Sequence, residues 1–571
     1  LVAQRIVIDG QTKPLFPGVM AIFGHGNVTT LGHSLEMHRD EIPVWRGQNE
    51  QGMGLAAVGF TKAMRRQQIM VCTSSIGPGA TNMVTAAGVA MANRLPVLFI
   101  SGDTFDSRLP DPVLQQVEHF GTPSTTVNDA FRPVVRYWDR ITHPAQVMTS
   151  LPQAVAMMLD PGDCGPAFIG LPQDVGGLAY DFPEEFFTTT VQEIPRPRAA
   201  VTQLERAVAA IRASKRPVII AGGGVHYSRA EAELAAFAEA FGIPVVETIA
   251  GKSSLLADHP RYVGPIGVTG SAQANAICAE ADLVLAIGTR LEDFTTGSWT
   301  IFDSSVPFVG INAARFDAVK HRSIPVVGDA RETLADLAPA LQGWNSVDGW
   351  VERGAHLRAE LGAFIDSRTA DDNVWPPSYA QIVGLAHASA TNADYCLTAA
   401  GYEISGAWGA ALARDKGEVY AFVGDGSYLM LNSDIYASVL SGRKFILIVC
   451  DNGGYAVIER LQVNQGGASY NNMLADSRGP NADVRVDFRA HAESMGAVTF
   501  EANSLEELST ALQAARAADR TAVIVTKVRA SDWTEGGSFW QVGIPEVSER
   551  PSVLTARDAQ ADGLRAQRRG I

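Results

Sequence analysis

The chain has 571 residues, which is too long for a single hydrophobic core and indicates about three domains of ordinary size. Apolar residues make up 46% of it and charged residues 19%, as in compact globular proteins. The net charge of −15 argues against nucleic acid or an anionic membrane surface as the main partner, because both bind basic surfaces. We therefore expect a small ligand.

The cysteines and the apolar runs indicate the compartment. No apolar run is long enough to cross a bilayer, and no secretory leader is visible. The cysteines are scattered without paired spacing, which favours reduced thiols in the cytoplasm and makes a disulfide framework or a zinc site improbable. They are Cys72, Cys164, Cys278, Cys396 and Cys450.

Three blocks of alternating strand and helix patterns follow one another along the chain. Strands such as "PVLFISGD" and "FILIVCD" are apolar on both faces, which is typical of parallel sheets covered by helices. Proline-containing linkers separate the blocks at 193–202 and 366–379. The predicted fold is α/β, with doubly wound parallel sheets in domains 1–190, 200–345 and 372–545, and a C-terminal arm or extra helix at 546–571.

The stretch "RGQNEQGMG" places Glu50 at the start of a predicted helix with many apolar residues. An acid at this position interacts favourably with the helix dipole and needs no other role. The alternative is a carboxyl group that faces a ligand from a partly apolar site, where desolvation would raise its pKa. The residues themselves leave both interpretations open.

Two glycine-rich stretches could approach a ligand. "GPGATN" is a Gly-Pro-Gly turn over 77–79 that leads into a helix, which suits an anion or a close backbone approach. The alternative is simple helix initiation with Thr81 and Asn82 as caps. "AGGGV" at 221–225 lacks the spacing of a dinucleotide fingerprint and is weak evidence for a nucleotide.

Two further strand patterns end in polar residues next to glycine. Asp425 follows "VYAFVG" and Asn452 follows "ILIVCD", with a helical pattern between the two strands. The carboxyl ends of parallel strands lie at one edge of a sheet, so the two side chains can converge there. Two hard oxygen ligands suggest Mg²⁺ or Ca²⁺, and Mg²⁺ commonly shares its coordination shell with phosphate oxygens. The alternative is an ordinary turn.

These motifs, in this order, resemble the thiamine diphosphate enzymes of the acetolactate synthase and pyruvate decarboxylase type. The resemblance rests on "RGQNEQG", "GPGATN", a central block with "RPVIIAGGG", and "GDG" followed by the later asparagine, and it spans nearly the whole chain. "AIFGHGNV", "DPVLQQVEHFG", "LEDFTTGSW" and "GGASYNN" are similar to the hydrolases that open a cyclic trihydroxy 1,2-dione in myo-inositol catabolism.

The resemblance implies a set of ligand contacts. Thiamine diphosphate and Mg²⁺ would be the cofactors, and FAD is possible but not expected. Asp425 and Asn452 would bind Mg²⁺ by their side chains and Gly454 by its carbonyl, while Glu50 would hydrogen-bond the aminopyrimidine. The implied cofactor-binding residues are Glu50, Gly77, Gly79, Asn82, Gly424, Gly426, Ser427, Gly454 and Tyr455. In such enzymes the site lies between subunits, so self-association is also implied.

The implied reaction is hydrolytic opening of a trihydroxycyclohexane-1,2-dione to 5-deoxyglucuronate, with a small cyclic diketone as substrate. Proton shuttles are needed, and a histidine or an amide is suitable. The candidates are His25 and Asn27 in the glycine-rich loop after an early strand, then Gln115 and Gln116. His33 and His119 are weaker candidates.

Two alternatives remain: an acetolactate-synthase-like carboligase or 2-oxo acid decarboxylase, and a relative that keeps the fold without catalysis. The pattern also departs from the family. The N-terminus looks incomplete, and Ala400 is followed directly by Gly401 where relatives carry a glycine-rich segment that contacts the cofactor. We therefore predict a chain break at 400/401 and an empty or partly ordered cofactor site.

Overall fold

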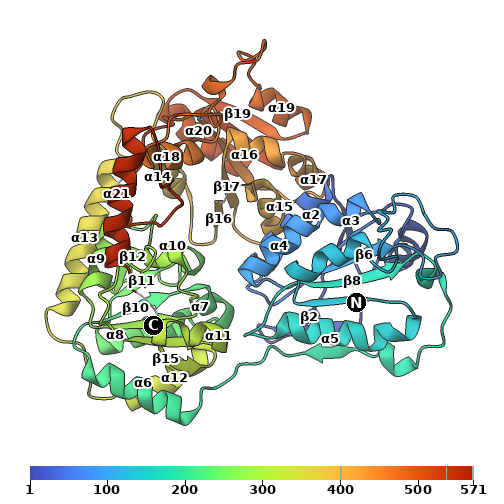
Figure 1. Ribbon diagram of the computed structural model, residues 1–571, viewed down its shortest axis with the longest axis horizontal. Helices are drawn as coiled ribbons and strands as arrows, with labels where there is room; N and C mark the ends of the chain where they lie inside the picture. Colours follow the sequence, from blue (N-terminus) through green and yellow to red (C-terminus); the bar gives the residue numbers. More distant parts are fainter. Residues whose placement is uncertain (399–400, 535, 569–571) are drawn as a thin grey trace. The chain divides into compact units, whose positions relative to one another are not determined.

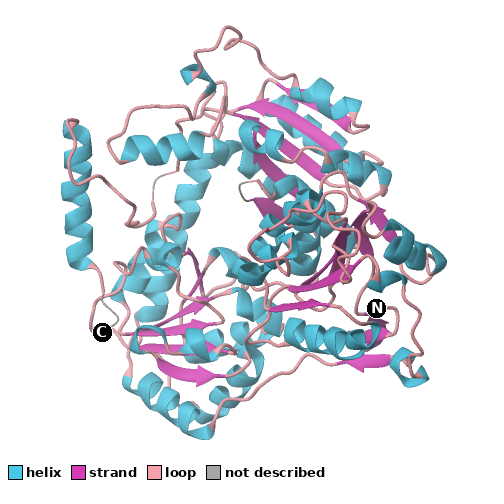
Figure 2. Ribbon diagram, turned by 45° about the vertical axis from the view of Figure 1, so that its right-hand side comes forward, coloured by secondary structure: helices cyan, strands magenta, loops and turns pink. Residues whose placement is uncertain are grey.

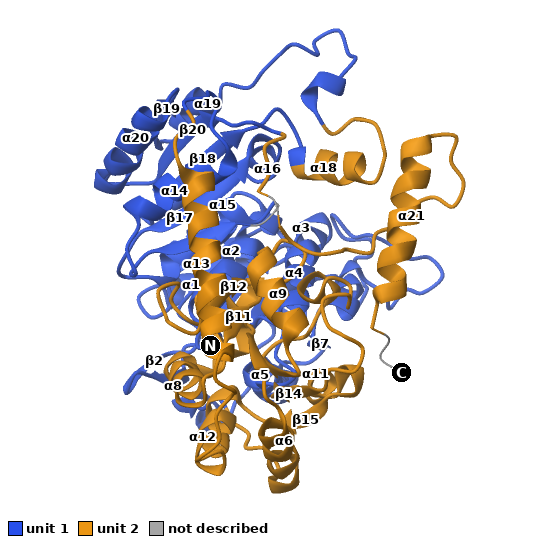
Figure 3. Cartoon of the chain, turned by 90° about the vertical axis from the view of Figure 1, so that its left-hand side faces the viewer, with its two compact units in different colours: residues 1–194, 373–456, 473–530 blue, residues 195–372, 457–472, 531–571 orange. Residues whose placement is uncertain are grey.

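The structure is a computed structural model that describes residues 1–398, 401–534 and 536–568. The predicted break at 400/401 involves Ala400, which lies outside the described residues. The chain forms two compact units (Figure 3). Unit 1 contains residues 1–194, 373–456 and 473–530, and unit 2 contains 195–372, 457–472 and 531–571. The boundaries at 194/195 and 372/373 fall inside the two linkers predicted from the sequence.

The first sheet of unit 1 has six strands in the order β4-β3-β5-β6-β8-β7, and every neighbouring pair is parallel. β5 and β6 are buried along their whole length, which explains their continuous apolar sequences. The strands are β3 (Val19–Ile22), β4 (Val44–Arg46), β5 (Met70–Ser74), β6 (Val97–Asp103), β7 (Tyr137–Arg140) and β8 (Ala167–Pro172). The helices are α1 (His33–Met37), α2 (Glu50–Ala63), α3 (Pro78–Asn82), α4 (Val84–Asn93) and α5 (Val147–Leu159).

The second sheet of unit 1 has five parallel strands in the order β16-β17-β18-β20-β19. The strands are β16 (Tyr395–Thr398), β17 (Val419–Gly424), β18 (Ile446–Asp451), β19 (Val498–Ala502) and β20 (Ala522–Lys527). The helices are α14 (Tyr379–Ser389), α15 (Glu403–Ala413), α16 (Asp425–Met430), α17 (Asp434–Leu440), α19 (Phe488–Ser494) and α20 (Leu505–Ala517). α16 and α17 form the predicted crossover between β17 and β18 (Figure 1).

Glycines join the two halves of unit 1 by letting α2 and α15 approach closely. A Cβ at Gly409 would lie 1.7 Å from the Ala56 carbonyl oxygen, and a Cβ at Gly59 would lie 2.3 Å from the Gly406 carbonyl oxygen. Both distances are far below van der Waals contact, so only glycine fits at these positions. The helix that begins at Glu50 is therefore held against the second sheet's helical layer.

Unit 2 contains a six-stranded parallel sheet in the order β12-β11-β10-β13-β14-β15. Successive residues of β10 enter two different apolar clusters: Ile219 belongs to one, and Val218 and Ile220 to the other. Both faces of the sheet are therefore buried under helices, as expected for a doubly wound domain. The strands are β10 (Pro217–Ala221), β11 (Val245–Glu247), β12 (Tyr262–Pro265), β13 (Leu283–Ile287), β14 (Phe308–Asn312) and β15 (Ile324–Val327).

Helices surround this sheet and complete unit 2 (Figure 2). They are α6 (Val201–Ala213), α7 (Gly223–Ser228), α8 (Glu231–Phe241), α9 (Ala272–Glu280), α10 (Asp293–Thr296), α11 (Arg315–Ala318), α12 (Ala330–Ala340) and α13 (Trp350–Thr369). Two further helices are α18 (Ala456–Asn464), nearly all of it in unit 2, and α21 (Pro551–Ala566), which lies in the predicted C-terminal arm. No helix in the described part of the chain could span a membrane.

The fold class predicted from the sequence is confirmed, since three parallel α/β sheets are present. Unit 1 also contains a small sheet that the sequence patterns did not reveal. It pairs β1 (Gln4–Ile8) antiparallel with β2 (Gln11–Pro14) and parallel with β9 (Thr190–Gln192). The β1–β9 pairing ties the start of the N-terminal domain to its last residues before the first linker.

Candidate active site

The two polar strand ends lie side by side in unit 1. β17 and β18 are parallel neighbours, with Gly424 opposite Cys450. Asp425 follows β17 as the first residue of α16, and Asn452 follows β18. The Asn452 backbone N–H donates to Oδ1 of Asp425 at 3.2 Å. The predicted convergence of these two residues at one edge of the sheet is therefore present.

The carboxyl group of Asp425 is buried, with 3% of the residue exposed. Burial raises its pKa to about 6, and the nearby Asp451 adds to this rise, while the hydrogen bond from Asn452 opposes it. Among the described residues, no basic side chain pairs with Asp425. A buried carboxylate without a positive partner is costly, and a divalent cation would relieve that cost.

The turn after Asn452 is built on two glycines with positive φ angles. Oδ1 of Asn452 accepts from the Gly454 N–H at 3.1 Å, and Gly453 and Gly454 have φ angles of +78° and +146°. These angles favour glycine and leave the backbone open to close approach. Within the described residues there is no cluster of three or more His, Cys, Asp or Glu that could hold a metal. One carboxylate, one amide and one carbonyl suit Mg²⁺, which takes its remaining ligands from water and phosphate.

The other predicted diphosphate-binding residues gather around this turn. Gly424 caps α16, and a Cβ there would lie 3.2 Å from Nδ2 of Asn452. A Cβ at Gly426 would lie 2.6 Å from the ring of Tyr455, so the ring can lie there only because residue 426 is glycine. Ser427 follows in the same helix, α16. The structure thus brings these residues together, and their contact with a cofactor remains a prediction.

Glu50 begins α2, as the sequence indicated, and Asn49 caps the helix by accepting from the Gly52 N–H at 3.1 Å. Oε2 of Glu50 accepts from Nδ2 of Asn82 at 2.8 Å. A Cβ at Gly79 would lie 3.2 Å from Oε1 of Glu50. The Gly-Pro-Gly turn therefore leaves space at the carboxylate, and Asn82 fixes its orientation.

The alternative in which Thr81 and Asn82 act as helix caps is wrong. α3 begins at Pro78 with Gly77 as its N-cap, so both residues lie inside the helix and not before it. Gly77 has a φ of +61°, and a Cβ there would lie 2.1 Å from the Gln115 carbonyl oxygen. Glycine is required at this position because the loop that carries Gln115 crosses directly over the turn.

The glycine-rich loop after β3 places His25 against a distant carbonyl. Nε2 of His25 lies 2.8 Å from the Leu114 carbonyl oxygen. Because a carbonyl only accepts, Nε2 carries the hydrogen and Nδ1 of neutral His25 is left as the proton acceptor. His25 is half-buried, so its ring is not enclosed by this contact.

Asn27 is only 2% exposed, and its amide is fully engaged inside the protein. Its Nδ2 donates to Oγ1 of Thr73 and to the Ser74 carbonyl, and its Oδ1 accepts from the Gly24 N–H. These bonds show that Asn27 shapes the loop. A part in proton transfer remains a prediction.

Among the remaining shuttle candidates, the Gln116 side chain is part-buried and the others are exposed. Gln115 is exposed with a φ of +65°, and Oε1 of Gln116 accepts from the Val113 N–H at 2.8 Å inside its own loop. His33 and His119 are exposed. The structure therefore places His25 against the Leu114 carbonyl, and the Gln116 side chain bonds back to its own loop.

Sequence reasoning missed Asp434, the first residue of α17. It is completely buried, and its Oδ2 lies 2.5 Å from the position of a Cβ at Gly52, in the first turn of α2. Neither carboxyl oxygen has a hydrogen bond of normal geometry within the described residues. Burial raises its pKa to about 7, opposed by the nearby Ser405 hydroxyl. The local pattern "NSDIYASVL" gave no signal beyond an ordinary helix start.

Comparison with known families matches three stretches of the chain. They correspond to the N-terminal TPP binding domain (18–121), the central domain (204–337) and the C-terminal TPP binding domain (378–526) of thiamine pyrophosphate enzymes. These matches cover more than half of the chain, and the chain belongs to the thiamine pyrophosphate enzyme family. Its first and last matched domains are thiamine diphosphate-binding domains, as the resemblance implied.

Curated relatives of this family are similar over almost the whole chain. The chain is 40% identical to the 3D-(3,5/4)-trihydroxycyclohexane-1,2-dione hydrolase of Shouchella clausii, covering 99% of this chain and 96% of the relative. The Bacillus subtilis enzyme of the same name is 40% identical, with 98% of this chain and 96% of that enzyme covered. The Listeria monocytogenes enzyme of that name is 39% identical, with 99% of this chain and 97% of that enzyme covered. The alignment with the Shouchella clausii enzyme has 618 positions. That enzyme therefore contains segments with no counterpart in these 571 residues.

Proposed function

We propose that the protein hydrolyses 3D-(3,5/4)-trihydroxycyclohexane-1,2-dione to 5-deoxyglucuronate in myo-inositol degradation. The observation that carries this proposal is the identity of about 40% over nearly full length to hydrolases of that name. In the reaction, the bond between the two carbonyl carbons breaks. One carbon takes the hydroxyl group of water and becomes the acid, and the other takes the hydrogen and becomes the aldehyde.

We further propose that Mg²⁺ is held by the Asp425 carboxylate, the Asn452 amide oxygen and the Gly454 carbonyl. The support is the buried, unpaired Asp425 next to a glycine turn at the end of β18. The chemistry that thiamine diphosphate supplies when bound is a stabilised carbanion able to add to a carbonyl group. The protein supplies the positioning and the charges around it.

Glu50 would hold a proton at the aminopyrimidine ring, with Asn82 fixing the orientation of its carboxylate. His25 would accept or return a proton at Nδ1, since its Nε2–H is committed to the Leu114 carbonyl. Asn27, in the loop after β3, and Gln115 and Gln116, in the loop that contacts His25, would support His25 in this role. The exposure of Gln115 leaves its amide free to face a substrate.

We propose self-association with sites between subunits, and residence in the cytoplasm. All five cysteines are free and four of them are buried, which suits a reducing compartment. Analytical ultracentrifugation tests the first proposal, because a purely monomeric active enzyme would contradict it.

The substrate assay tests the main proposal. The protein, loaded with thiamine diphosphate and Mg²⁺, is incubated separately with the cyclic dione and with pyruvate. We expect each dione consumed to give one product molecule that carries one acid group and one aldehyde group. We expect no acetolactate or CO₂ from pyruvate. Consumption of pyruvate alone would favour the carboligase or decarboxylase alternative.

Calorimetry separates these enzymes from a non-catalytic relative. We expect thiamine diphosphate to bind in the presence of Mg²⁺ and Asp425→Ala to abolish that binding. Absence of binding by the wild-type protein would favour a relative that keeps the fold only. A visible absorption spectrum of the purified protein tests for FAD, which we do not expect.

A further inference from the structure

A long connection joins β6 to the rest of the N-terminal domain and carries the backbone that contacts His25. Residues 104–126 contain no helix or strand, and most of them are exposed. Their middle nevertheless has a defined position, because the Leu114 carbonyl accepts from His25 and the Gln115 carbonyl lies over Gly77. A loop of this length has many alternative conformations, so something must hold it in place.

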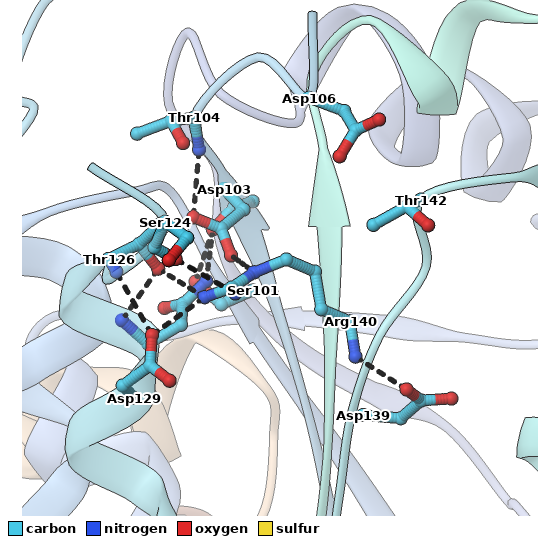
Figure 4. A network of polar contacts seen from close by, with 12 residues as sticks. Ser101, Asp103, Thr104, Asp106, Ser124, Thr126, Asp129, Asp139, Arg140 and Thr142 are labelled. Carbon is cyan, nitrogen blue, oxygen red and sulfur yellow. Dashed lines mark hydrogen bonds and ion pairs between the residues drawn. The ribbon is translucent and has the colours of Figure 1, made fainter. Parts of the chain in front are cut away.

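One guanidinium bonds both ends of this loop (Figure 4). Arg140, the last residue of β7, donates from Nε to Oδ2 of Asp103 at 2.8 Å, immediately before the loop begins. Its Nη2 donates to Oγ1 of Thr126 at 2.7 Å and to Oδ2 of Asp129 at 2.8 Å, where the loop ends. The planar fork of arginine suits such a bridge, and lysine cannot reproduce it.

The bridge is partly buried and its charges are balanced. Asp103 is 2% exposed, and its Oδ1 accepts from the Thr104 N–H at 2.8 Å. Burial alone would lower the pKa of Arg140, but Asp103 and Asp129 raise it above its ordinary value. Asp129 also accepts from Nε of Arg132 at 2.7 Å. Two acids and two guanidinium groups thus form one network, and Asp103 depends most on Arg140, because a buried charge that loses its partner is costly.

A second anchor lies after β8. Oδ1 of Asp174 accepts from the Asp106 N–H at 2.9 Å, and its Oδ2 accepts from the Ser107 N–H at 3.0 Å. These bonds fix the first residues of the loop independently of Arg140. The middle of the loop, which reaches His25, lies between these two anchors.

We propose that Arg140 is a positioning residue for His25: it closes the base of loop 104–126 so that the Leu114 carbonyl holds the hydrogen of His25 on Nε2. Only one part of this inference rests on the proposed function, namely the proton-transfer role of His25. The closure itself is a property of the protein without cofactor. The side-chain hydrogen bonds of Arg140 go to both ends of the loop and not to His25, so it acts through the loop.

Hydrogen–deuterium exchange on the protein without cofactor tests the closure. Arg140→Lys keeps the charge beside Asp103 and loses the fork, while Asp174→Ala removes the second anchor at a more accessible position. We expect the amides of 104–126 to exchange about tenfold faster in each variant, with β5 and β6 unchanged. Arg132→Lys is the matched control, because Arg132 bonds Asp129 without bridging the loop, and its exchange should equal that of the wild type.

Nitrogen-15 NMR of ring-labelled histidine tests the consequence, with His25 assigned by its loss in His25→Gln. We expect a single Nε2–H form in the wild type and in Arg132→Lys, and a mixture of both neutral forms in Arg140→Lys. Unchanged exchange in 104–126 together with an unchanged His25 signal in Arg140→Lys and Asp174→Ala overturns the proposal.

Steady-state kinetics with the cyclic dione completes the test. We expect kcat of Arg140→Lys to fall about tenfold to a hundredfold, with thiamine diphosphate affinity within about twofold of the wild type. If the loop is loosened in Arg140→Lys but its kcat equals that of the wild type, the proposal that Arg140 positions His25 for the reaction is overturned. If the wild type does not consume the dione, the proposed function fails, whereas the exchange and NMR results still decide whether Arg140 closes the loop.

Discussion

Asp434 places a carboxyl group in the interior of unit 1, against the first turn of the helix that begins at Glu50. Burial raises the pKa of Asp434 from its ordinary 3.8 to about 7. The folded protein therefore binds this proton more tightly than the unfolded chain. Between about pH 4 and pH 7 the free energy of unfolding falls as pH rises, and the loss from this one group is complete above pH 7.

Asp434→Asn removes this loss while keeping the shape of the side chain. Each pKa unit corresponds to about 1.4 kcal/mol, so the shift of Asp434 amounts to about 4 kcal/mol at pH 8. At pH 5 the folded carboxyl group is still neutral but that of the unfolded chain is already ionised, so the variant should be more stable than the wild type by about 2 kcal/mol. At pH 8 the variant should be more stable, with a melting temperature several degrees higher.

Thermal unfolding of both proteins at pH 5 and pH 8 measures this difference. Asp519→Asn is the control, because the Asp519 side chain is 80% exposed and its replacement should have the same small effect at both pH values. A difference in melting temperature between Asp434→Asn and wild type that does not grow from pH 5 to pH 8 would refute the reasoning. Asp434 would then be ionised at no cost in the folded protein.

Three further predictions concern helix packing and the two halves of the site. Gly409→Ala should push α15 away from α2 and greatly lower the melting temperature, since the new Cβ would lie 1.7 Å from a backbone oxygen; Gly362→Ala, with nothing within 4 Å, should have little effect. Asn82→Ala should lower kcat about tenfold to a hundredfold by removing the hydrogen bond to Glu50, with the melting temperature nearly unchanged; equal kcat values would contradict the role of Asn82. A chelator should abolish activity and added Mg²⁺ should restore it in the wild type, whereas Asp425→Ala should not recover at any Mg²⁺ concentration tested, and its recovery would exclude Asp425 as a ligand.

Much of the fold could be predicted from the sequence because the signals are local. Runs such as 446–451 are buried on both faces and form parallel strands, and the glycines after them end each strand abruptly. Glu50 lies at a helix start because Asn49 is a good cap and the following residues favour a helix. The convergence of Asp425 and Asn452 followed from one general rule about parallel sheets.

Other features depended on which distant elements pack together. Asp103 and Arg140 lie 37 positions apart, on strands separated by β8 in the sheet, and no local pattern pairs them. Asn82 seemed suited to capping, but the turn begins its helix four residues earlier and directs the amide to Glu50.

The sequence by itself determined the three parallel sheets, the family and the residues at the ends of β17 and β18, because strand patterns and glycine turns are properties of short segments. The tertiary structure alone decided that Arg140 closes the loop over His25 and that Asp434 is buried against Gly52. Such partners are selected by the close packing of whole helices and sheets, in which many weak contacts act together and no single segment determines the outcome.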